Sequence, residues 1–552
     1  MSMRPQEISP VPEETARVAL AANPKGNVYM RMRDELGSIY EDQMFVTLFP
    51  RRGQPAEAPW RLALVTVMQY MEGLSDRQAA EAVRERIDWK YVLSLELTDP
   101  GFDFSVLSEF RTRLLTGGAE TQLLQALLDL CKSRGWLKAR GHQRTDSTHV
   151  LAAIRDLNRL ECVGETLRHT LNVLAEVAPD WLLAQIDPQW FDRYSRRFDE
   201  YRFPKAQTER LAFAEMIGAD GHWLLAAVYA PIAPAWLADL PAVETLRQVW
   251  VQQFYVEEGR CRWRSNENIP PPSLIIASPY DLDARLGVKR NHGWIGYKVH
   301  LTETCDDDQP HLIVHTETTA ATTPDWAMAE PIHTALATLD ALPSRHVVDG
   351  GYVDADAIVT SRTRHDVELF GPVPLENSWQ AKAACGFDLS HFEIDWQGQT
   401  VRCPTGQLSR SWTSTRDRFG QEVIYVKFAA ADCLVCPSHE ECTQARARSL
   451  TFRPQALYLA LQSARQRQST AAFKEAYAIR AGIESTISQA VRVSDLRQAR
   501  YFGLPKTKLQ HVITATAINV RRIVSWLIEP SLRPTQVSRF AALALKQSKP
   551  AA

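Results

Sequence analysis

The chain has 552 residues, 45% of them hydrophobic and 23% charged, and its formal net charge is −2. This length is too great for one hydrophobic core, so we expect two to four folding units in an ordinary globular protein. No run approaches the roughly 18 uncharged apolar residues that a membrane-spanning helix needs, and the start, MSMRPQEISPVPEE, lacks the apolar core of a signal peptide. These features predict a cytoplasmic protein.

Charge is unevenly spread along the chain. Between residues 441 and 510 there are twelve Lys or Arg and four Asp or Glu. Such a basic run is typical either of a solvated helical face or of a surface that binds nucleic acid, and the run alone does not decide between them.

The N-terminal quarter is predicted to be helical after a poorly ordered tail, rich in Pro and Glu, at residues 1–25. Apolar residues recur at three- and four-residue steps from Trp60 until Gly73 ends the pattern. Ser75 and Gln78 then match a capping box, in which each side chain bonds the other residue's backbone N–H, and they predict the start of a second helix.

A third helix completes the expected helical module of residues 26–135. We expect the hydroxyl of Ser105 to cap this helix, which buries its leucines and turns Arg111 and Arg113 outward. Short helices with basic faces suit DNA binding in the manner of a helix-turn-helix, although the same pattern builds any small bundle.

The pattern changes to strand near residue 141, where GHQRTDSTHVLA alternates around Asp146. A helical insertion is predicted over residues 155–290. Strands return from Trp294 to Thr302 and in HLIVHTETT, and these two are expected to form an antiparallel hairpin.

A helix, a strand, a second helix and a last strand are expected next. The first helix runs from Asp325 to Leu339, the strand SRHVVDGGY ends at Asp349, Asp354 caps the second helix, and VELFGPV is the last strand. This order predicts a mixed α/β sheet, built from residues 136–374 and, after an interruption, 444–530.

The interruption, residues 375–443, contains short alternating strands with Gly turns and is predicted to be a separate β-rich insertion. Helices resume after it, and residues 531–552 are expected to fray. Four of the nine cysteines fall within one forty-residue segment of this insertion with the spacing C-x29-C-x2-C-x5-C: Cys403, Cys433, Cys436 and Cys442. Four thiolates can close a structural zinc site, with His391 and His439 as spare ligands, and ordinary thiols are the alternative.

Three acids are candidates for binding divalent metal ions. Asp146 lies within the first strand, and Asp349 lies at the carboxyl end of a strand, where open α/β sheets bind ligands. Glu484 lies on a basic helix on the same face as Tyr477 and Arg480. Mg²⁺ prefers carboxylate oxygens, but each acid taken alone is also compatible with a surface or capping role.

Four segments resemble, in this order, transposases of the 1182 family of insertion sequences: RTDSTHVLAAIRDLNRLECVGETLRHTL, GYKVHLTETCD, VVDGGYVDA and YAIRAGIESTISQAVRVSDLRQARYFGLPKTKLQHVITATAINVRR. The resemblance spans nearly the whole chain and includes residues 40–115, which are similar to a helical module of several insertion-sequence transposases. It implies an RNase H-like fold, as in retroviral integrases, in a bacterial, nucleoid-associated protein.

The resemblance also implies a DDE triad of Asp146, Asp349 and Glu484 that binds two Mg²⁺ or Mn²⁺ ions. A related pattern, Tyr-x2-Arg-x3-Glu-x6-Lys, is met by Tyr477, Arg480 and Glu484. It fails at its last position, which is Val491, and the neighbouring Arg492 is a candidate replacement.

The activity implied is hydrolysis of phosphodiesters at the transposon ends, followed by attack of each freed 3′-hydroxyl on target DNA. The implied partners are double-stranded DNA, with its terminal inverted repeats and target site, and a second copy of the chain, because two ends must be joined. The predicted DNA contacts are Tyr477, Arg480, Arg492, Arg497, Arg500, Lys506, Lys508, Lys298 and His300.

Two other functions fit the same residues. One is an RNase H-like nuclease that cuts DNA without joining it, and the other is a catalytically inactive DNA-binding protein descended from a transposase. The three acids argue against the second, because a chain freed from catalysis need not keep all of them.

Overall fold

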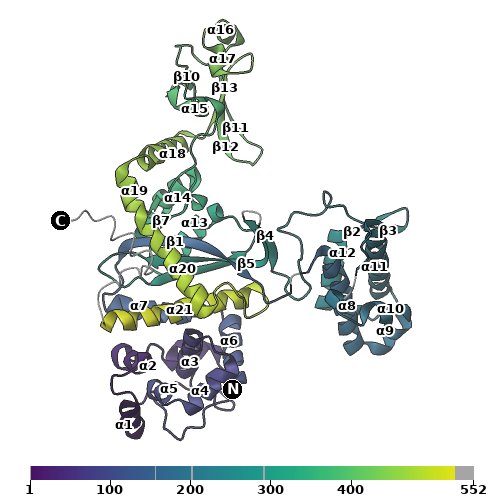
Figure 1. The fold of residues 1–552 in the computed structure, drawn as a ribbon, viewed down its shortest axis with the longest axis vertical. Coiled ribbons are helices and arrows are strands. Elements are labelled where there is room, and N and C mark those ends of the chain that lie inside the picture. Colours follow the sequence, from purple (N-terminus) through teal and green to yellow (C-terminus); the bar gives the residue numbers. More distant parts are fainter. Residues whose placement is uncertain (1, 156, 201–202, 290–291, 529–552) are drawn as a thin grey trace, which may run out of the picture. The chain divides into compact units, whose positions relative to one another are not determined.

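The chain divides into two compact units in the computed structural model, which describes residues 2–155, 157–200, 203–289 and 292–528. Unit 1 comprises Met1–Lys138, Ser147–Thr323 and Thr486–Ala552, and unit 2 comprises Ala139–Asp146 and Pro324–Ser485. Figure 1 follows the chain by colour through both. The fraying predicted for residues 531–552 lies outside the described residues.

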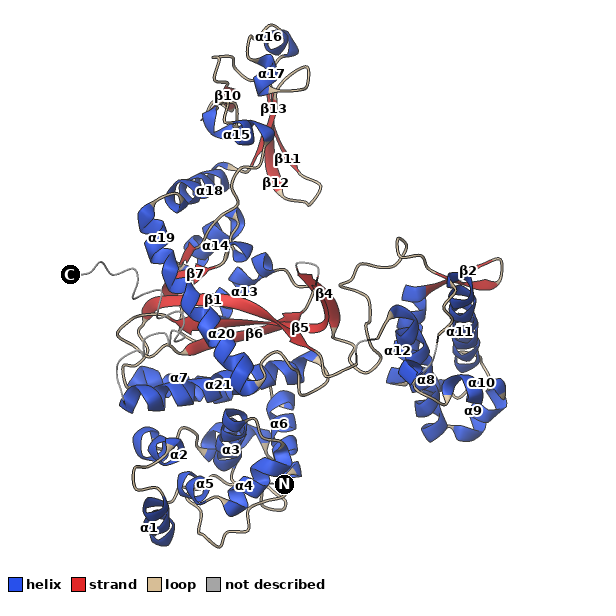
Figure 2. Cartoon of the chain, viewed as in Figure 1, coloured by secondary structure: helices blue, strands red, loops and turns tan. Residues whose placement is uncertain are grey.

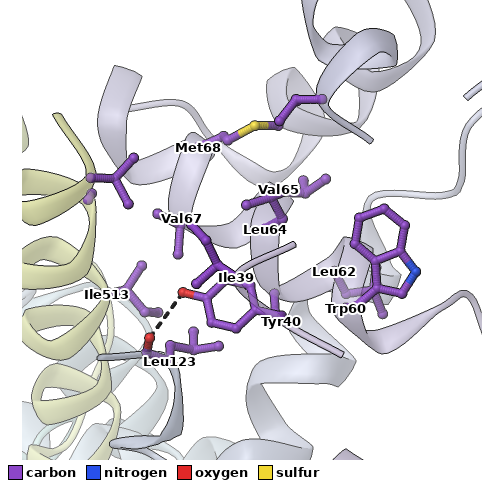
Figure 3. Packing of buried hydrophobic residues seen from close by; sticks show 14 of the residues in the cluster. Ile39, Tyr40, Trp60, Leu62, Leu64, Val65, Val67, Met68, Leu123 and Ile513 are labelled. Atoms are coloured by element: carbon purple, nitrogen blue, oxygen red, sulfur yellow. Dashed lines mark hydrogen bonds between the residues drawn. The ribbon is translucent and has the colours of Figure 1, made fainter. Parts of the chain in front are cut away.

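Unit 1 begins with a helical module, as predicted. Its α-helices are α1 (Glu13–Ala22), α2 (Val28–Arg31), α3 (Pro59–Glu72), α4 (Asp76–Glu85), α5 (Ile87–Val92), α6 (Ser105–Thr116) and α7 (Gln122–Ser133), with a π-helical turn at Met32–Leu36 and a 3-10 helix at Asp42–Leu48. The module's apolar core also includes residues of the C-terminal helix α21 (Leu504–Ile528). Figure 3 shows Ile513 of α21 near Val67 and Tyr40, whose hydroxyl donates a hydrogen bond to the carbonyl oxygen of Leu123 at 3.0 Å.

The capping box predicted at the start of α4 is confirmed. The Gln78 N–H donates to Ser75 Oγ at 3.3 Å, and the Ser75 N–H donates to Gln78 Oε1 at 2.9 Å. Gly73 ends α3 in the left-handed conformation, with φ of 71°.

Two predictions for this module are wrong. Ser105 does not cap α6: its hydroxyl and its N–H both donate to Asp103 Oδ1. Arg111 does not face outward, because its buried guanidinium forms an ion pair with Asp76 at 2.5 Å. Both partners are acids that the helical periodicity of α6 does not reveal.

The prediction that residues 1–25 form a poorly ordered tail is also wrong for part of that range. Glu13–Ala22 form α1, in which Thr15 donates to the carbonyl oxygen of Leu95 at 2.8 Å. Ala19 is buried against Met30 and Tyr91. These long-range contacts hold a helix whose own sequence is a weak predictor of order.

Unit 1 also holds the antiparallel strands of the sheet. They are β4 (Arg285–Lys289), β5 (His292–Thr304) and β6 (Ile313–Ala320), so the predicted hairpin is confirmed as β5–β6. Helix α21 packs on β6, where the Asn519 side chain accepts from the Ile313 N–H and donates to the Ile313 carbonyl oxygen, both at 2.8 Å. The Asn519 amide thus satisfies the two backbone groups of Ile313 as a neighbouring strand would.

The predicted helical insertion of residues 155–290 is helical only as far as Gln253. Its helices are α8 (Arg159–Val177), α9 (Pro179–Gln185), α10 (Gln189–Tyr194), α11 (Gln207–Val228) and α12 (Pro241–Gln253). A hairpin of β2 (Phe254–Glu257) and β3 (Arg260–Trp263) follows, which the sequence analysis did not predict. The helices enclose an apolar core of their own.

Helix α11 is long and apolar enough to cross a membrane, contrary to the expectation that no segment approaches this. A third of its apolar window is buried, and Ile217, Leu224 and Val228 lie in the core of the insertion. One such helix is weak evidence, because a core helix passes the same test.

Unit 2 carries parallel strands. The first residues of β1 (Arg140–Leu151) pair with β7 (Pro343–Val348), and β7 pairs with β8 (Glu368–Phe370). The helices of this unit include α13 (Ala329–Thr338), α14 (Ala355–His365), α18 (Gln455–Gln468) and α19 (Ala471–Tyr477), and α20 (Ala481–Ser494) starts in it. The strand order β4-β5-β1-β7-β8, with β6 beside β5, confirms the predicted mixed α/β sheet.

The β-rich insertion is present in unit 2 and extends beyond residue 443. It contains β9 (Glu393–Asp395), β10 (Thr400–Arg402), β11 (Ser411–Arg416), β12 (Glu422–Lys427) and β13 (Ser449–Phe452), together with α15 (Trp379–Ala383), α16 (Ala430–Leu434) and α17 (His439–Cys442). Figure 2 shows β11 and β12 as a hairpin. Strand β13 lies after the predicted boundary because it pairs with β12.

Candidate active site

Asp146 and Asp349 follow paired positions on two parallel strands of unit 2. The register of β1 and β7 pairs Thr145 with Val348, the residues directly before the two aspartates. Side chains alternate along a strand, so the next residue on each strand leaves the sheet on the same side. The backbone of Asp349 is still extended, with φ of −77° and ψ of 165°. The two carboxylates therefore lie at the same edge of the sheet.

Arg480 brings these two aspartates together with Glu484. Its Nη2 lies 2.7 Å from Asp146 Oδ2 and 3.9 Å from Asp349 Oδ2, and its Nη1 lies 2.8 Å from Glu484 Oε1. The side chains of Asp146, Asp349 and Glu484 are 15%, 39% and 63% exposed, so each can also be reached from solvent. One guanidinium therefore contacts all three predicted catalytic acids.

The helix predicted to carry Tyr477, Arg480 and Glu484 is interrupted. Helix α19 ends at Tyr477, residues Ala478–Arg480 form a 3-10 turn, and α20 begins at Ala481. The turn directs Arg480 toward Asp146 while Glu484 stays within reach at i+4. Burial alone lowers the pKa of Arg480, but the carboxylates of Asp146, Glu484 and Asp349 outweigh it and raise that pKa. The guanidinium stays charged.

Tyr477 packs on apolar neighbours beside the triad. Its ring is stacked on Phe473, with ring centroids 5.5 Å apart and planes 11° apart, and Phe473 packs on Phe370 of β8. Burial raises the pKa of Tyr477, and the nearby Arg480 opposes that rise. The phenol is therefore protonated at neutral pH and can serve as a hydrogen-bond donor.

Arg144 and Gly482 hold α20 against β1. Arg144 is buried, and its Nη1 donates to the carbonyl oxygen of Ile479 at 2.5 Å. A Cβ atom on residue 482 would lie 2.1 Å from that Nη1 and 2.2 Å from the Arg144 Cζ. A side chain at residue 482 would therefore have to displace either the Arg144 guanidinium or the start of α20, which carries Glu484.

A buried histidine pair joins strand β7, which carries His346, to helix α13, which carries His333. Thr145 Oγ1 is 2.6 Å from His346 Nε2, and His346 Nδ1 is 2.8 Å from His333 Nε2. Burial lowers the pKa of His333 to about 4, and the charge of His365 adds to this effect. Thr145 directly precedes Asp146, so these hydrogen bonds fix the strand next to the triad.

The other predicted DNA contacts lie in unit 1. Arg492 and Lys506 are exposed, and the guanidinium of Arg492 donates to the carbonyl oxygen of Ser488. Lys298, Arg497 and Lys508 are partly buried and bond to Thr323, Thr148 and Glu317, respectively.

Two of the predicted DNA contacts do not suit that role. His300 is fully buried in β5, so the prediction that it contacts DNA is wrong for this structure. Arg500 lies over the Tyr70 ring, 4.5 Å from its centroid, and donates to the carbonyl oxygen of Leu74. Its contacts join α21's N-terminal flank to the helical module, which periodicity could not show.

The three acids of the triad supply only carboxylate oxygens, and the Arg480 guanidinium lies among them. Across the described residues, no group of three or more His, Cys, Asp or Glu side chains is arranged as it lies to hold a metal. Three carboxylates contacting one cationic side chain nevertheless supply the all-oxygen donor set that Mg²⁺ or Mn²⁺ prefers.

The four cysteines of the β-rich insertion line one small pocket in unit 2, together with His439 and Thr405. Burial raises the pKa of the Cys442 thiol to about 11; Arg448 opposes this rise, and the other three thiols add to it. His391 instead bonds to Asp388 and does not line the pocket.

The sequence analysis missed several residues that support the site, above all Arg144 and Gly482. Both lie inside the quoted motifs, two positions before Asp146 and two before Glu484. Their shared position, two residues before a predicted catalytic acid, is the sequence feature that could have pointed to them.

Two family models match the chain. One is described as "Transposase DDE domain" and matches residues 402–524; the other is described as "Transposase domain (DUF772)" and matches residues 18–113. The first match includes Glu484 and the cysteine pocket, and the second covers most of the helical module. No curated protein and no solved structure matches the chain. The two family matches indicate an insertion-sequence transposase of the DDE type.

Proposed function

We propose that this transposase hydrolyses phosphodiesters at the transposon ends and joins each freed 3′-hydroxyl to target DNA at one site, formed by Asp146, Asp349 and Glu484. We also propose that its sheet is RNase H-like. The mixed sheet, with Asp146 on a strand that has a parallel neighbour carrying Asp349, supports this fold.

The observation that carries the proposal is the convergence of three acids around Arg480. Asp146 and Glu484 are 338 positions apart in sequence, yet both bond the same guanidinium. Asp349 also accepts from the Gly351 N–H and caps the turn after it, but capping does not require three acids to meet at one guanidinium. The arrangement therefore favours a catalytic site over the inactive DNA-binding alternative.

In the proposed reaction, Asp146, Asp349 and Glu484 would hold two divalent cations, which would supply activation of the attacking oxygen and stabilisation of the leaving oxygen of the phosphodiester. Arg480 neutralises part of the carboxylate charge, which lowers the repulsion that an approaching phosphate meets. Arg144 and Gly482 set the position of Glu484 relative to Asp146, and the Tyr477 hydroxyl is available to donate to the DNA backbone.

DNA binding is proposed for the helical module and for the exposed cations Arg492 and Lys506. We keep Lys298, Arg497 and Lys508 as weaker candidates, because each already bonds a protein oxygen. A second copy of the chain is proposed in the complex that pairs two transposon ends.

The test is a cleavage assay on labelled duplex DNA that carries the inverted repeats flanking the coding sequence in its genome. We expect Asp349→Asn and Glu484→Gln, which keep side-chain shape, to abolish strand cleavage while retaining binding to end DNA. Asp356→Asn is the matched control, because this exposed acid of unit 2 pairs with Arg453. Full cleavage by Asp349→Asn would refute the assignment.

A second assay separates the transposase from the nuclease that cuts without joining. End DNA supplied with its 3′-hydroxyl already free should be joined to a supercoiled target plasmid by the wild-type protein and not by Glu484→Gln. Cleavage of intact ends without any joining of pre-cut ends would favour the nuclease.

A further inference from the structure

The β-rich insertion contains two short helices that touch its apolar core only through the partly buried Cys433 and Cys442. Helices α16 and α17 bury no residue among those they contain. The apolar core of the insertion consists of Phe392, Val401, Ile424, Val426, Phe428, Leu450 and Phe452, all from the strands and their flanks. Small cores of this kind are commonly reinforced by a disulfide or a metal ion.

Four cysteines converge where these two helices meet the turn after β10. Cys403 follows β10, Cys433 lies in α16, Cys436 lies between the helices, and Cys442 ends α17. All four line one pocket of about 30 Å³, which is large enough for a particle the size of a water molecule or a metal ion. None of the four forms a disulfide.

The backbone around two of the sulfurs favours thiolates. The Gln407 N–H lies 3.2 Å from Cys403 Sγ, and the Arg448 N–H lies 3.5 Å from Cys433 Sγ. Cys403 also begins a tight turn in which the Gly406 N–H donates to its carbonyl oxygen at 2.8 Å. N–H groups directed at sulfur stabilise the charged form, which is the form that binds metal.

His439 adds an independent sign of a missing partner. It lines the same pocket, and its Nε2 is buried without a hydrogen-bond partner among the described atoms. Buried polar atoms nearly always have a partner, so this nitrogen points to a group that the pocket takes up.

We propose that Cys403, Cys433, Cys436 and Cys442 bind one structural Zn²⁺, which fixes α16 and α17 to the turn after β10. Four thiolates form a closed tetrahedral site. As they lie, the described side chains form no such group, so zinc binding requires the thiols to rotate about Cα–Cβ toward one another. His439 Nε2 then donates to a bound thiolate. This proposal does not depend on the DNA-cleavage proposal, because none of these residues belongs to the triad.

Zinc content of the purified full-length protein tests the proposal. We expect one zinc ion per chain in protein prepared without chelator, and a loss of at least tenfold in Cys433→Ser and Cys436→Ser. Cys385→Ser is the matched control: this cysteine lies in the same insertion, but its Sγ bonds the Glu441 carbonyl oxygen and does not line the pocket. Cys385→Ser and Asp349→Asn should both keep their zinc.

Replacement of zinc by Co²⁺ shows which ligands bind. The wild-type protein and His439→Asn should both give the strong visible absorption of tetrahedral, thiolate-bound Co²⁺. Zinc-free protein that binds neither ion, or a disulfide between any two of the four cysteines, would overturn the proposal. Loss of metal in His439→Asn with retention in Cys442→Ser would overturn the four-thiolate ligand set.

Discussion

Gly482→Ala is a substitution whose effect on catalysis follows from one contact. On an ordinary helix this change is stabilising by about 1 kcal/mol, because alanine loses less backbone freedom than glycine. Here the new Cβ would lie 2.1 Å from Arg144 Nη1, whereas ordinary contacts begin at 3.4 Å. The two groups must therefore separate by about 1.3 Å.

Most of that separation is expected to appear as a displacement of α20. Arg144 is buried, and its guanidinium would lose its bond to the Ile479 carbonyl oxygen if it withdrew. The displaced residues carry Glu484, and a misplacement of about 1 Å in a catalytic constellation costs roughly 10²-fold in rate. We expect Gly482→Ala to cleave end DNA at about 1% of the wild-type rate.

The assay is single-turnover cleavage of labelled end DNA, with the thermal unfolding midpoint measured in parallel. Ser485→Ala is the control, because Ser485 is an exposed residue next to Glu484. In a double-mutant cycle, Arg144→Ala should abolish most of the further loss caused by Gly482→Ala, since the clash is gone. Cleavage by Gly482→Ala within twofold of wild type would refute the packing argument.

The remaining predictions concern charge. Arg480→Gln leaves three carboxylates without their cation, so the metal-free variant should unfold at a lower temperature than the wild type. Added Mg²⁺ should raise the thermal unfolding midpoint of the variant more than that of the wild type. Equal effects of Mg²⁺ on the two midpoints would contradict this prediction. The folded-state pKa of His333, about 4, lies below its ordinary value of 6.5, so the unfolded chain takes up the proton first as pH falls. The stability present above pH 6.5 is then lost between pH 6.5 and pH 4, by up to about 3 kcal/mol, and His333→Gln should show a shallower fall in melting temperature over that range. Arg492→Ala and Lys506→Ala should each reduce the salt dependence of end-DNA binding by about one phosphate contact, whereas Arg500→Ala should mainly lower the melting temperature.

Local patterns predicted the elements of the sheet well. The alternation around Asp146, the hairpin β5–β6 and the strand before Asp349 all lie where the sequence places them, because each has a side-chain period of two that its own residues determine. The capping box of Ser75 and Gln78 was predictable for the same reason, since both partners lie within one turn.

Features that depend on distant partners could not be predicted in this way. The periodicity of its helix predicts that Arg111 is exposed, but its guanidinium bonds Asp76, which lies thirty-five residues earlier in the sequence. Helix α1 is ordered by contacts with Leu95 and Tyr91, and the division into units follows from the packing of α21 with the N-terminal module. In the site, periodicity placed Glu484 on a helix but did not predict the 3-10 turn that directs Arg480 toward the aspartates.

Helix α21 completes the core of the N-terminal helical module, but the ribosome synthesises it long after that module. The helices up to Ser133 emerge early, but Leu509, Ile513 and Val520, which complete their apolar core, are made almost 400 residues later. At a translation rate of about 5–20 residues per second, that delay is roughly 20–80 s. A chain truncated before α21 would leave this core open to chaperones and proteases. Prematurely terminated copies are therefore expected to be degraded, and not to persist as inhibitors that occupy transposon ends.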